Sequence, residues 1–286
     1  MNKTAIRWSR MPRAGKGMGE AILYLGLTIG SIVMMWPFVW MILSSTKSSL
    51  EILRVPPSFL PESPSLANYA KVLHEIPFTR YFFNSLVVST CVTLGVLLTS
   101  SLGGYIFGKF SFPGRQLLFT LVVGTMMIPF QVTVVPLYLT VLRLGLYNSY
   151  GALIVPGLVD AFGIFMMRQF MHEVPNELLD AARIDGASEY RIYANIVLPQ
   201  LRPALATLGI LTFLWSWNSF LWPVIAVASD EYRTIQLALA SFVSTRNLRY
   251  GLLMAASTMA VAPILVVFLA MQRGILRSIA MTGLKA

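Results

Sequence analysis

Val174–Pro199 has the sequence VPNELLDAARIDGASEYRIYANIVLP. It is the only long, charged, helix-like segment with apolar runs on both sides. Glu177 and Asp180 place negative charge in the first turns of a helix, where the helix dipole favours it, and Gly186 can end that helix in a left-handed conformation. A second helix can start at Ser188, a typical N-cap residue. We therefore expect two short helices joined by a tight turn.

The second short helix is predicted from apolar positions at helical spacing. These are Ile192, Tyr193, Ile196 and Val197, and Pro199 is expected to end the helix. The pair would carry one apolar and one charged face. Two interpretations fit this pattern: an ordinary amphipathic connection between membrane helices, or a surface on which another protein docks.

The composition indicates a membrane protein. Of 286 residues, 56% are hydrophobic and 12% are charged, whereas soluble domains carry about a quarter charged residues. The net charge of +10 is not a nucleic-acid signal here, because membrane proteins concentrate basic residues in cytoplasmic loops. Cys91 is the only cysteine and there are two histidines. The chain therefore has no internal disulfide, and neither a cysteine-based metal site nor a histidine cluster is expected.

Six apolar runs are long enough to cross about 30 Å of hydrocarbon. We predict an all-α, polytopic fold with a transmembrane domain at 20–272, between a basic tail at 1–19 and a C-terminal tail at 273–286. The predicted spans are 20–43, 81–107, 116–142, 150–171, 201–227 and 251–271. The first run is too long for a cleaved signal peptide and lacks a small-residue cleavage site, so we expect it to be retained.

The positive-inside rule orients these six spans. An even number of spans puts both termini on one side of the membrane. With the termini inside, the larger share of the lysines and arginines is cytoplasmic, including the basic residues of both tails. This orientation also places the 175–199 loop in the cytoplasm. The expected location is the inner membrane of a bacterial or archaeal cell.

One nucleotide-binding motif is present only in part. Gly103–Lys109 satisfies the G-x4-G-K spacing of a P-loop, but Phe110 stands where the Mg²⁺-binding Ser or Thr is required. A helical membrane run also precedes it, where a P-loop needs a strand. We reject the P-loop, and we read Gly104 and Gly108 as a close-packing face of a membrane helix.

Four residues within the spans are candidates for lining a pathway: Asp160, Trp215, Trp217 and Asn218. A charge in the bilayer is costly, so Asp160 is expected to face a cavity or to have a function. Alternatively, it hydrogen-bonds a neighbouring helix or faces water. The two tryptophans and the asparagine could contact a sugar, because sugars stack on aromatic rings and hydrogen-bond to amide groups. Anchoring at the membrane interface or packing between helices explains these residues equally well.

The 175–199 loop resembles the EAA loop of permease subunits of ATP-binding-cassette (ABC) importers. Asp180-Ala181-Ala182, Gly186 and Ile196-Val197-Leu198-Pro199 carry the resemblance, with Asp180 where the family has Glu. Further likeness to the carbohydrate-uptake (maltose-type) branch extends over nearly the whole chain. It is carried by WPFVW at 36–40, Asn68-Tyr69, Asn84-Ser85-Leu86, Phe112–Arg115 and WNSFLWP at 217–223. The chain is most similar to the shorter of the two permeases.

The resemblance implies a sugar importer subunit that is not an enzyme. It implies a second homologous permease, two copies of a cytoplasmic ATPase that hold ATP and Mg²⁺, an extracytoplasmic solute-binding protein and the lipid bilayer as partners. No cofactor is expected in this chain. The residues implied to couple to the ATPase are Glu177, Asp180, Ala181, Ala182, Asp185, Gly186, Ile196, Leu198 and Pro199. The substrate would be an oligosaccharide or a related polyol.

Two other function classes fit the sequence less well. An ion-coupled secondary transporter would use Asp160, but such proteins tend to be built from paired repeats, and no clear internal repeat is present. A membrane enzyme lacks support, because no paired carboxylates, metal cluster or nucleophile–base pair occurs in a suitable place.

Overall fold

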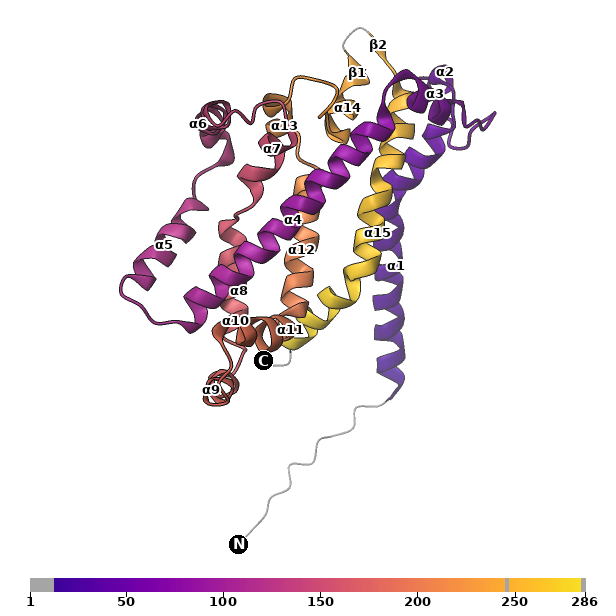
Figure 1. Cartoon of the computed structure of the whole chain (residues 1–286). Coiled ribbons are helices and arrows are strands. Elements are labelled where there is room, and N and C mark those ends of the chain that lie inside the picture. The colour runs from indigo at the N-terminus through magenta and orange to yellow at the C-terminus, as the bar shows by residue number, and fades with distance from the viewer. Residues whose placement is uncertain (1–12, 245–246, 284–286) are drawn as a thin grey trace.

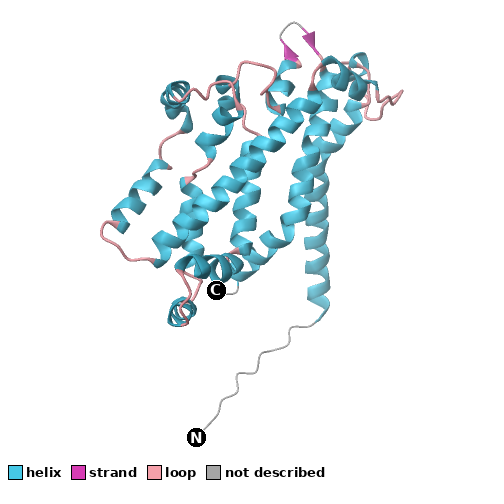
Figure 2. Ribbon diagram, viewed as in Figure 1, coloured by secondary structure: helices cyan, strands magenta, loops and turns pink. Residues whose placement is uncertain are grey.

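Long helices, connected by short and mostly helical segments, make up the fold (Figure 1). The computed structural model describes residues 13–244 and 247–283. Part of each predicted tail therefore lies outside the described residues, including Lys3, Arg7, Arg10 and Lys285. The all-α expectation is confirmed. The described residues add one small antiparallel pair, in which Val243 faces Leu248 and Ser244 faces Asn247 (Figure 2).

The elements alternate between membrane-length helices and short helices at the two ends of the bundle. In chain order they are α1 (Arg13–Ser45), α2 (Ser49–Ile52), α3 (Ala67–Glu75), α4 (Phe78–Lys109), α5 (Arg115–Thr125), α6 (Phe130–Arg143), α7 (Tyr150–Ile154), η1 (Val155–Gly157), α8 (Ala161–Met171), α9 (Asn176–Ile184), α10 (Glu189–Ile192), η2 (Tyr193–Val197), α11 (Leu198–Gln200), α12 (Arg202–Trp217), α13 (Leu221–Ala226), α14 (Ile235–Ser241), β1 (Val243–Ser244), β2 (Asn247–Leu248) and α15 (Tyr250–Gly283).

Four helical segments are long and apolar enough to cross a membrane on their own. They are Gly19–Ser45, Phe78–Lys109, Tyr150–Met171 and Tyr250–Ala270, and they coincide with the first, second, fourth and sixth predicted spans. None of the most apolar window of the first segment is buried inside the protein. Helix α1 packs mainly along α15, at the edge of the bundle (Figure 1), and its last residue, Ser45, contacts Tyr69 of α3. Most of its apolar surface is therefore available to lipid.

The third predicted span, 116–142, is not one straight helix. Helices α5 and α6 meet at an angle of 100°. Pro129 stands at the break, with the extended backbone of an N-cap residue. A proline has no N–H to donate and disfavours the helical conformation in the residue before it. Pro129 therefore divides the predicted span into two helices.

The fifth predicted span, 201–227, is interrupted near its C-terminal end. Helix α12 stops at Trp217, and α13 begins at Leu221 after a short break. At the end of α12 the Leu214 carbonyl accepts two hydrogen bonds from Asn218, one from its backbone N–H at 3.1 Å and one from its side-chain amide at 2.8 Å. At its other end, α12 is bent by 78° from the helical segment Glu189–Gln200.

Helix α4 is the centre of the bundle and packs against both α8 and α12. A β-carbon built on Gly104 would lie 2.6 Å from the β-carbon of Met167, and one built on Gly108 would lie 2.7 Å from that of Met171. The two helices therefore approach each other through glycine, as the Gly104/Gly108 spacing predicted.

The fourth segment is broken in its middle, between η1 and α8. Asp160 is the N-cap of α8, and its carboxylate accepts a hydrogen bond from the Gly163 amide at 2.9 Å. On the other side of the break, the carbonyl of Leu158 accepts from the Thr99 hydroxyl of α4 at 2.8 Å. Irregular backbone at membrane depth needs such partners, so α4 stabilises the break.

Candidate functional site

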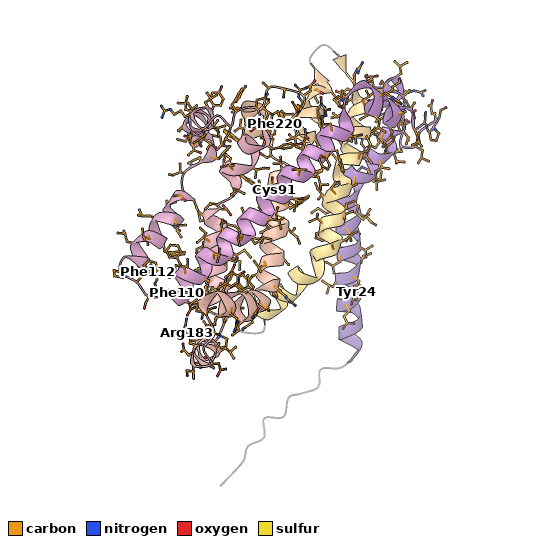
Figure 3. All side chains as sticks on the ribbon, in the orientation of Figure 1. Tyr24, Cys91, Phe110, Phe112, Arg183 and Phe220 are labelled. Carbon is orange, nitrogen blue, oxygen red and sulfur yellow. The ribbon has the colours of Figure 1, made fainter. Side chains whose placement is uncertain are left out.

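The 175–199 loop projects from one end of the bundle. Helices α9, α10 and α11 lie together at the end where α1 begins and α15 finishes, and Arg183 on α9 is among the outermost labelled residues (Figures 1 and 3). The opposite end carries α2, α3, α14 and the strand pair (Figure 1). The loop is therefore grouped in space with the predicted cytoplasmic ends of the chain.

The turn between the two short helices has the predicted geometry. Gly186 has a φ of +78°, in the left-handed region where L-residues with a β-carbon are strained. The Ala187 amide donates to the Ala182 carbonyl at 2.9 Å, and the Gly186 amide donates to the Arg183 carbonyl at 3.0 Å. This pair of bonds is a Schellman motif. Ser188 then caps α10 by accepting from the Arg191 amide, as the sequence predicted.

Helix α9 presents one face to the bundle and another to solvent. Leu179 is buried and Ala182 is partly buried, both against the core. Glu177, Asp180 and Ala181 point outward. Two large side chains beside the turn, Ile184 and Tyr190, are 86% and 80% exposed. The exposed side of the turn therefore combines small, acidic and apolar groups, which is a composition suited to contact with another protein.

The loop is held to the C-terminal end of α4 by polar contacts. The Tyr105 hydroxyl donates to a Glu189 carboxylate oxygen at 2.7 Å. Arg183 donates to the other oxygen of that carboxylate at 2.7 Å and to Asp180 at 2.8 Å. These bonds join α4, α9 and α10 in one network. The pKa of the Arg183 guanidinium is raised, first of all by its hydrogen bond to Glu189.

Two further contacts attach the ends of the loop to α4. The Lys109 ammonium group donates to the Val174 carbonyl and, at 2.8 Å, to the Asn176 side chain, just where α9 begins. The hydroxyls of Ser101 and Tyr193 lie 2.7 Å apart in the core. The loop is thus fixed at its start, its turn and its second helix to a single long helix.

The remaining part of the loop differs from the sequence prediction. Pro199 does not end the second helix, which continues to Gln200. Residues Tyr193–Val197 form a π-helical turn, and the Leu198 amide donates to the Tyr193 carbonyl. A proline ring clashes with the carbonyl four residues earlier, and the wider π turn relieves that clash. Helix α12 follows after the bend at Leu201.

The nine predicted coupling residues fall into two groups. Glu177, Asp180, Ala181, Asp185, Gly186 and Pro199 are exposed, whereas Ala182, Ile196 and Leu198 are partly buried against the core. The exposed group belongs mainly to α9 and its turn. The partly buried group connects the loop to the bundle.

Two cavities of about 480 Å³ and 490 Å³ lie beside α4. Both are lined by Val92, Phe130 and Trp215, among others, so they adjoin. The first also reaches α13 and Thr234 near the α14 end of the bundle, and the second reaches Asp160. Volumes of this size are typical of small-molecule sites.

The four predicted pathway residues are only partly brought together. Trp215 lines both cavities, Asn218 lines the first and Asp160 lines the second. Trp217 is 1% exposed, and its indole N–H donates to the Ala260 carbonyl on α15 at 3.2 Å. Trp217 therefore packs in the core and does not line either cavity. One helical residue separates it from Trp215, which is enough to place it on another face.

The sequence did not predict several of these contacts. Tyr105 and Glu189 are 84 positions apart, and no local signal in the sequence links them. Asn84 donates to the carbonyls of Glu231 and Arg233 at 2.8 and 2.9 Å, and so ties the loop before α14 to α4. Within residues 13–244 and 247–283 no three metal-ligating side chains gather.

Residues 100–281 match the family model described as binding-protein-dependent transport system inner membrane component. The chain is 34% identical to the arabinooligosaccharides transport system permease protein AraQ of Halalkalibacterium halodurans, covering 92% of this chain and 96% of that protein. It is 33% identical to the lactose transport system permease protein LacG of Rhizobium radiobacter, covering 89% and 92%.

A third relative is the sn-glycerol-3-phosphate transport system permease protein UgpE of Agrobacterium fabrum, which is 30% identical over 93% of this chain and 97% of that protein. Among solved structures, the fold is similar to a bacterial ABC transporter involved in the import of the acidic polysaccharide alginate. The TM-score is 0.79 at 20% identity, covering 93% of this chain and 99% of that one. At that identity the likeness concerns the fold.

Proposed function

The chain belongs to the family of binding-protein-dependent transport system inner membrane components, and from this premise we infer that it is the permease subunit of an ABC importer. Its task is to form half of a translocation pathway through the membrane. The substrate class that fits the relatives is a sugar, such as an oligosaccharide or a related polyol. The chain is a transporter subunit and not an enzyme.

The 175–199 loop couples this pathway to a separate ATPase. The observation that carries the proposal is the projecting turn at Gly186, with exposed Ile184 and Tyr190 beside it. An apolar, partly acidic protrusion on a short helix is suited to fill a groove on a partner. Because α4 holds the loop through Glu189 and Tyr193, a movement of the docked partner is transmitted to the centre of the bundle.

The assembly proposed around this chain has four kinds of partner. A second homologous permease completes the pathway, two copies of an ATPase bind ATP and Mg²⁺, and an extracytoplasmic binding protein delivers the substrate. Both termini lie in the cytoplasm, on the side of the 175–199 loop. The 228–250 segment at the opposite end faces the binding protein, and the residues after Arg277 reach toward the ATPases. The bilayer covers the exposed apolar surface of α1.

The translocation pathway follows the two cavities beside α4. Asp160, Trp215 and Asn218 line it, and Trp217 supports it from the core. An ion-coupled transporter that uses Asp160 gains no support from the comparisons. The carboxylate of Asp160 has a structural task as the cap of α8.

A pair of glycine variants tests the docking proposal. Gly186 and Gly114 both have left-handed φ angles, of +78° and +80°, and a β-carbon at either position meets no atom within 4 Å. The connection between α4 and α5, which contains Gly114, lies at the same end of the bundle as α9 and α10 (Figure 1). Only Gly186 belongs to the 175–199 loop. The backbone strain of a substitution, about 1–2 kcal/mol, is therefore matched between them.

We expect Gly186→Trp to weaken ATPase binding by at least roughly tenfold, because the ring occupies the docking surface, and Gly114→Trp to have less than about a threefold effect. ATPase binding is measured by titration of the permease pair in nanodiscs. ATP-driven uptake is measured in proteoliposomes with lactose, arabinotriose and sn-glycerol 3-phosphate as probes. Equal effects of the two variants would show that the loop is not the docking surface.

A further inference from the structure

We propose that residues 48–66, which connect α1 to α3, anchor the protein in the bilayer interface on the side opposite the 175–199 loop. Apolar side chains of this segment lie at the boundary between lipid headgroups and acyl chains, beside α1. The anchor involves lipid alone, so it is independent of the substrate and of the ATPase.

The 48–66 segment folds back along α1. The Phe59 ring packs on Trp36 and Trp40 of α1, with ring centroids 5.7 and 5.9 Å apart. Helix α1 ends at Ser45, so Trp36 lies about 13 Å below that end at 1.5 Å per residue. Between α2 and α3 the segment projects sideways past α1, whereas the strand pair points away along the bundle (Figure 1). The segment therefore extends over the region that lipid occupies.

The depth of Phe59 follows from the length of α1. The apolar segment Gly19–Ser45 has 27 residues, which is about 40 Å of helix. About 30 Å of hydrocarbon covers roughly twenty of these residues, and hydrocarbon centred on the segment ends near Ile42. Trp40 then lies at its edge and Trp36 lies inside it. Because Phe59 contacts both rings, it lies at the boundary, where aromatic side chains gather.

The segment also exposes large apolar side chains. Val55, Leu60 and Leu66 are 89%, 71% and 71% exposed, and Phe59 is exposed as well. A cluster of this kind marks a surface that contacts a membrane or another protein. The neighbouring helix decides between the two, because none of the most apolar window of α1 is buried inside the protein. The cluster thus continues a lipid-facing surface, and interfacial segments insert their apolar side chains about 5–10 Å into this boundary.

The charged side chains of the segment are engaged within the protein. Arg54 pairs with Glu62 at 2.5 Å, and the Glu51 carboxylate accepts from the Glu62 amide at 2.9 Å. Lys47, just before the segment, is buried with its ammonium group 4.9 Å from the centre of the Trp40 ring. These pairings hold the shape of the segment and leave its outer surface apolar. The anchor therefore binds lipid by apolar insertion and does not select anionic headgroups.

The test locates a nitroxide spin label at Leu60. The permease pair with its ATPase, in cysteine-free form, is placed in nanodiscs of phosphatidylcholine, and Cys91→Ala removes the only cysteine of this chain. Leu60→Cys then reports on the segment. Val243→Cys is the control, because Val243 is also apolar and exposed and belongs to β1 at the same end of the bundle (Figure 1). Both changes replace exposed side chains, so both variants are expected to fold.

The measurement is the ratio of collision rates of the label with oxygen and with a water-soluble nickel complex. We expect this ratio to be at least roughly threefold higher at Leu60 than at Val243, because apolar oxygen dissolves among acyl chains and the hydrated complex does not. Adding phosphatidylglycerol or the binding protein should leave the Leu60 ratio unchanged.

Three results would overturn the anchor. Equal ratios at Leu60 and Val243 would place the segment in water. Protection of the Leu60 label from both reagents, before or after the binding protein is added, would show that a protein covers the segment. A high ratio only with phosphatidylglycerol would show attachment by charge. None of these results bears on ATP-driven uptake, which tests the proposed function separately.

Discussion

The bond between Tyr105 and Glu189 should set how firmly the 175–199 loop presents its docking surface. Tyr105→Phe removes the hydroxyl that donates to the Glu189 carboxylate at 2.7 Å. The ring contacts with Tyr193 and Phe110, at centroid distances of 5.6 and 5.2 Å, are kept. The change is therefore confined to the link between α4 and α10.

The magnitude follows from the kind of bond and its exposure. A hydrogen bond to a charged group contributes about 1.5–3 kcal/mol when buried. The Glu189 side chain is 45% exposed and keeps its bond to Arg183, so solvent screening lowers the contribution. We expect a loss of about 1–1.5 kcal/mol, which corresponds to roughly five- to tenfold weaker ATPase binding.

The assay is titration of the ATPase onto the permease pair in nanodiscs, at several salt concentrations. Tyr138→Phe serves as the control, because the Tyr138 ring packs on Tyr147 but its hydroxyl makes no hydrogen bond within the described residues. A double-mutant cycle with Glu189→Gln should return a coupling energy of about 0.5–1.5 kcal/mol. If ATPase binding and uptake by Tyr105→Phe equal those of Tyr138→Phe, then α4 does not position the loop and the reasoning is refuted.

Three further changes test the scaffold. Gly104→Leu should lower the apparent Tm of the purified chain, because the β-carbon would lie 2.6 Å from a side-chain atom of α8. Overpacking of this kind costs about 1–3 kcal/mol of stability. Gly124→Leu is the control and should leave the Tm nearly unchanged, because a β-carbon there meets open space. Asp160→Ala should lower the free energy of unfolding by about 1 kcal/mol, because α8 loses its N-cap, whereas Asp160→Asn keeps the cap. Equal thermal stability of the two variants would contradict the capping role. Asn84→Leu should release the 228–234 segment from α4. Amide hydrogen exchange in that segment should become about tenfold faster, while exchange in α9 should not change. Unaltered exchange in the segment would show that other contacts hold it.

Elements with local signals were predictable from the residues alone. Apolar runs of membrane length gave the four long helical segments their places to within a few residues. The left-handed turn at Gly186 and the cap at Ser188 followed from residue type alone, because backbone conformation and the nearest amides decide such features. The close packing at Gly104 and Gly108 was also visible, since their four-residue spacing places them on one helix face.

Features that depend on partners far along the chain are visible only in the folded protein. The sequence located Pro129 but not the 100° bend it causes, because a proline in a membrane helix either kinks or breaks it according to what its neighbours can satisfy. Tyr105 meets Glu189, 84 positions away, only after α4 has packed among elements far along the chain. Trp215 and Trp217 look alike in sequence, yet one lines a cavity and the other fills the core. Packing, and not residue type, assigns a side chain to a site.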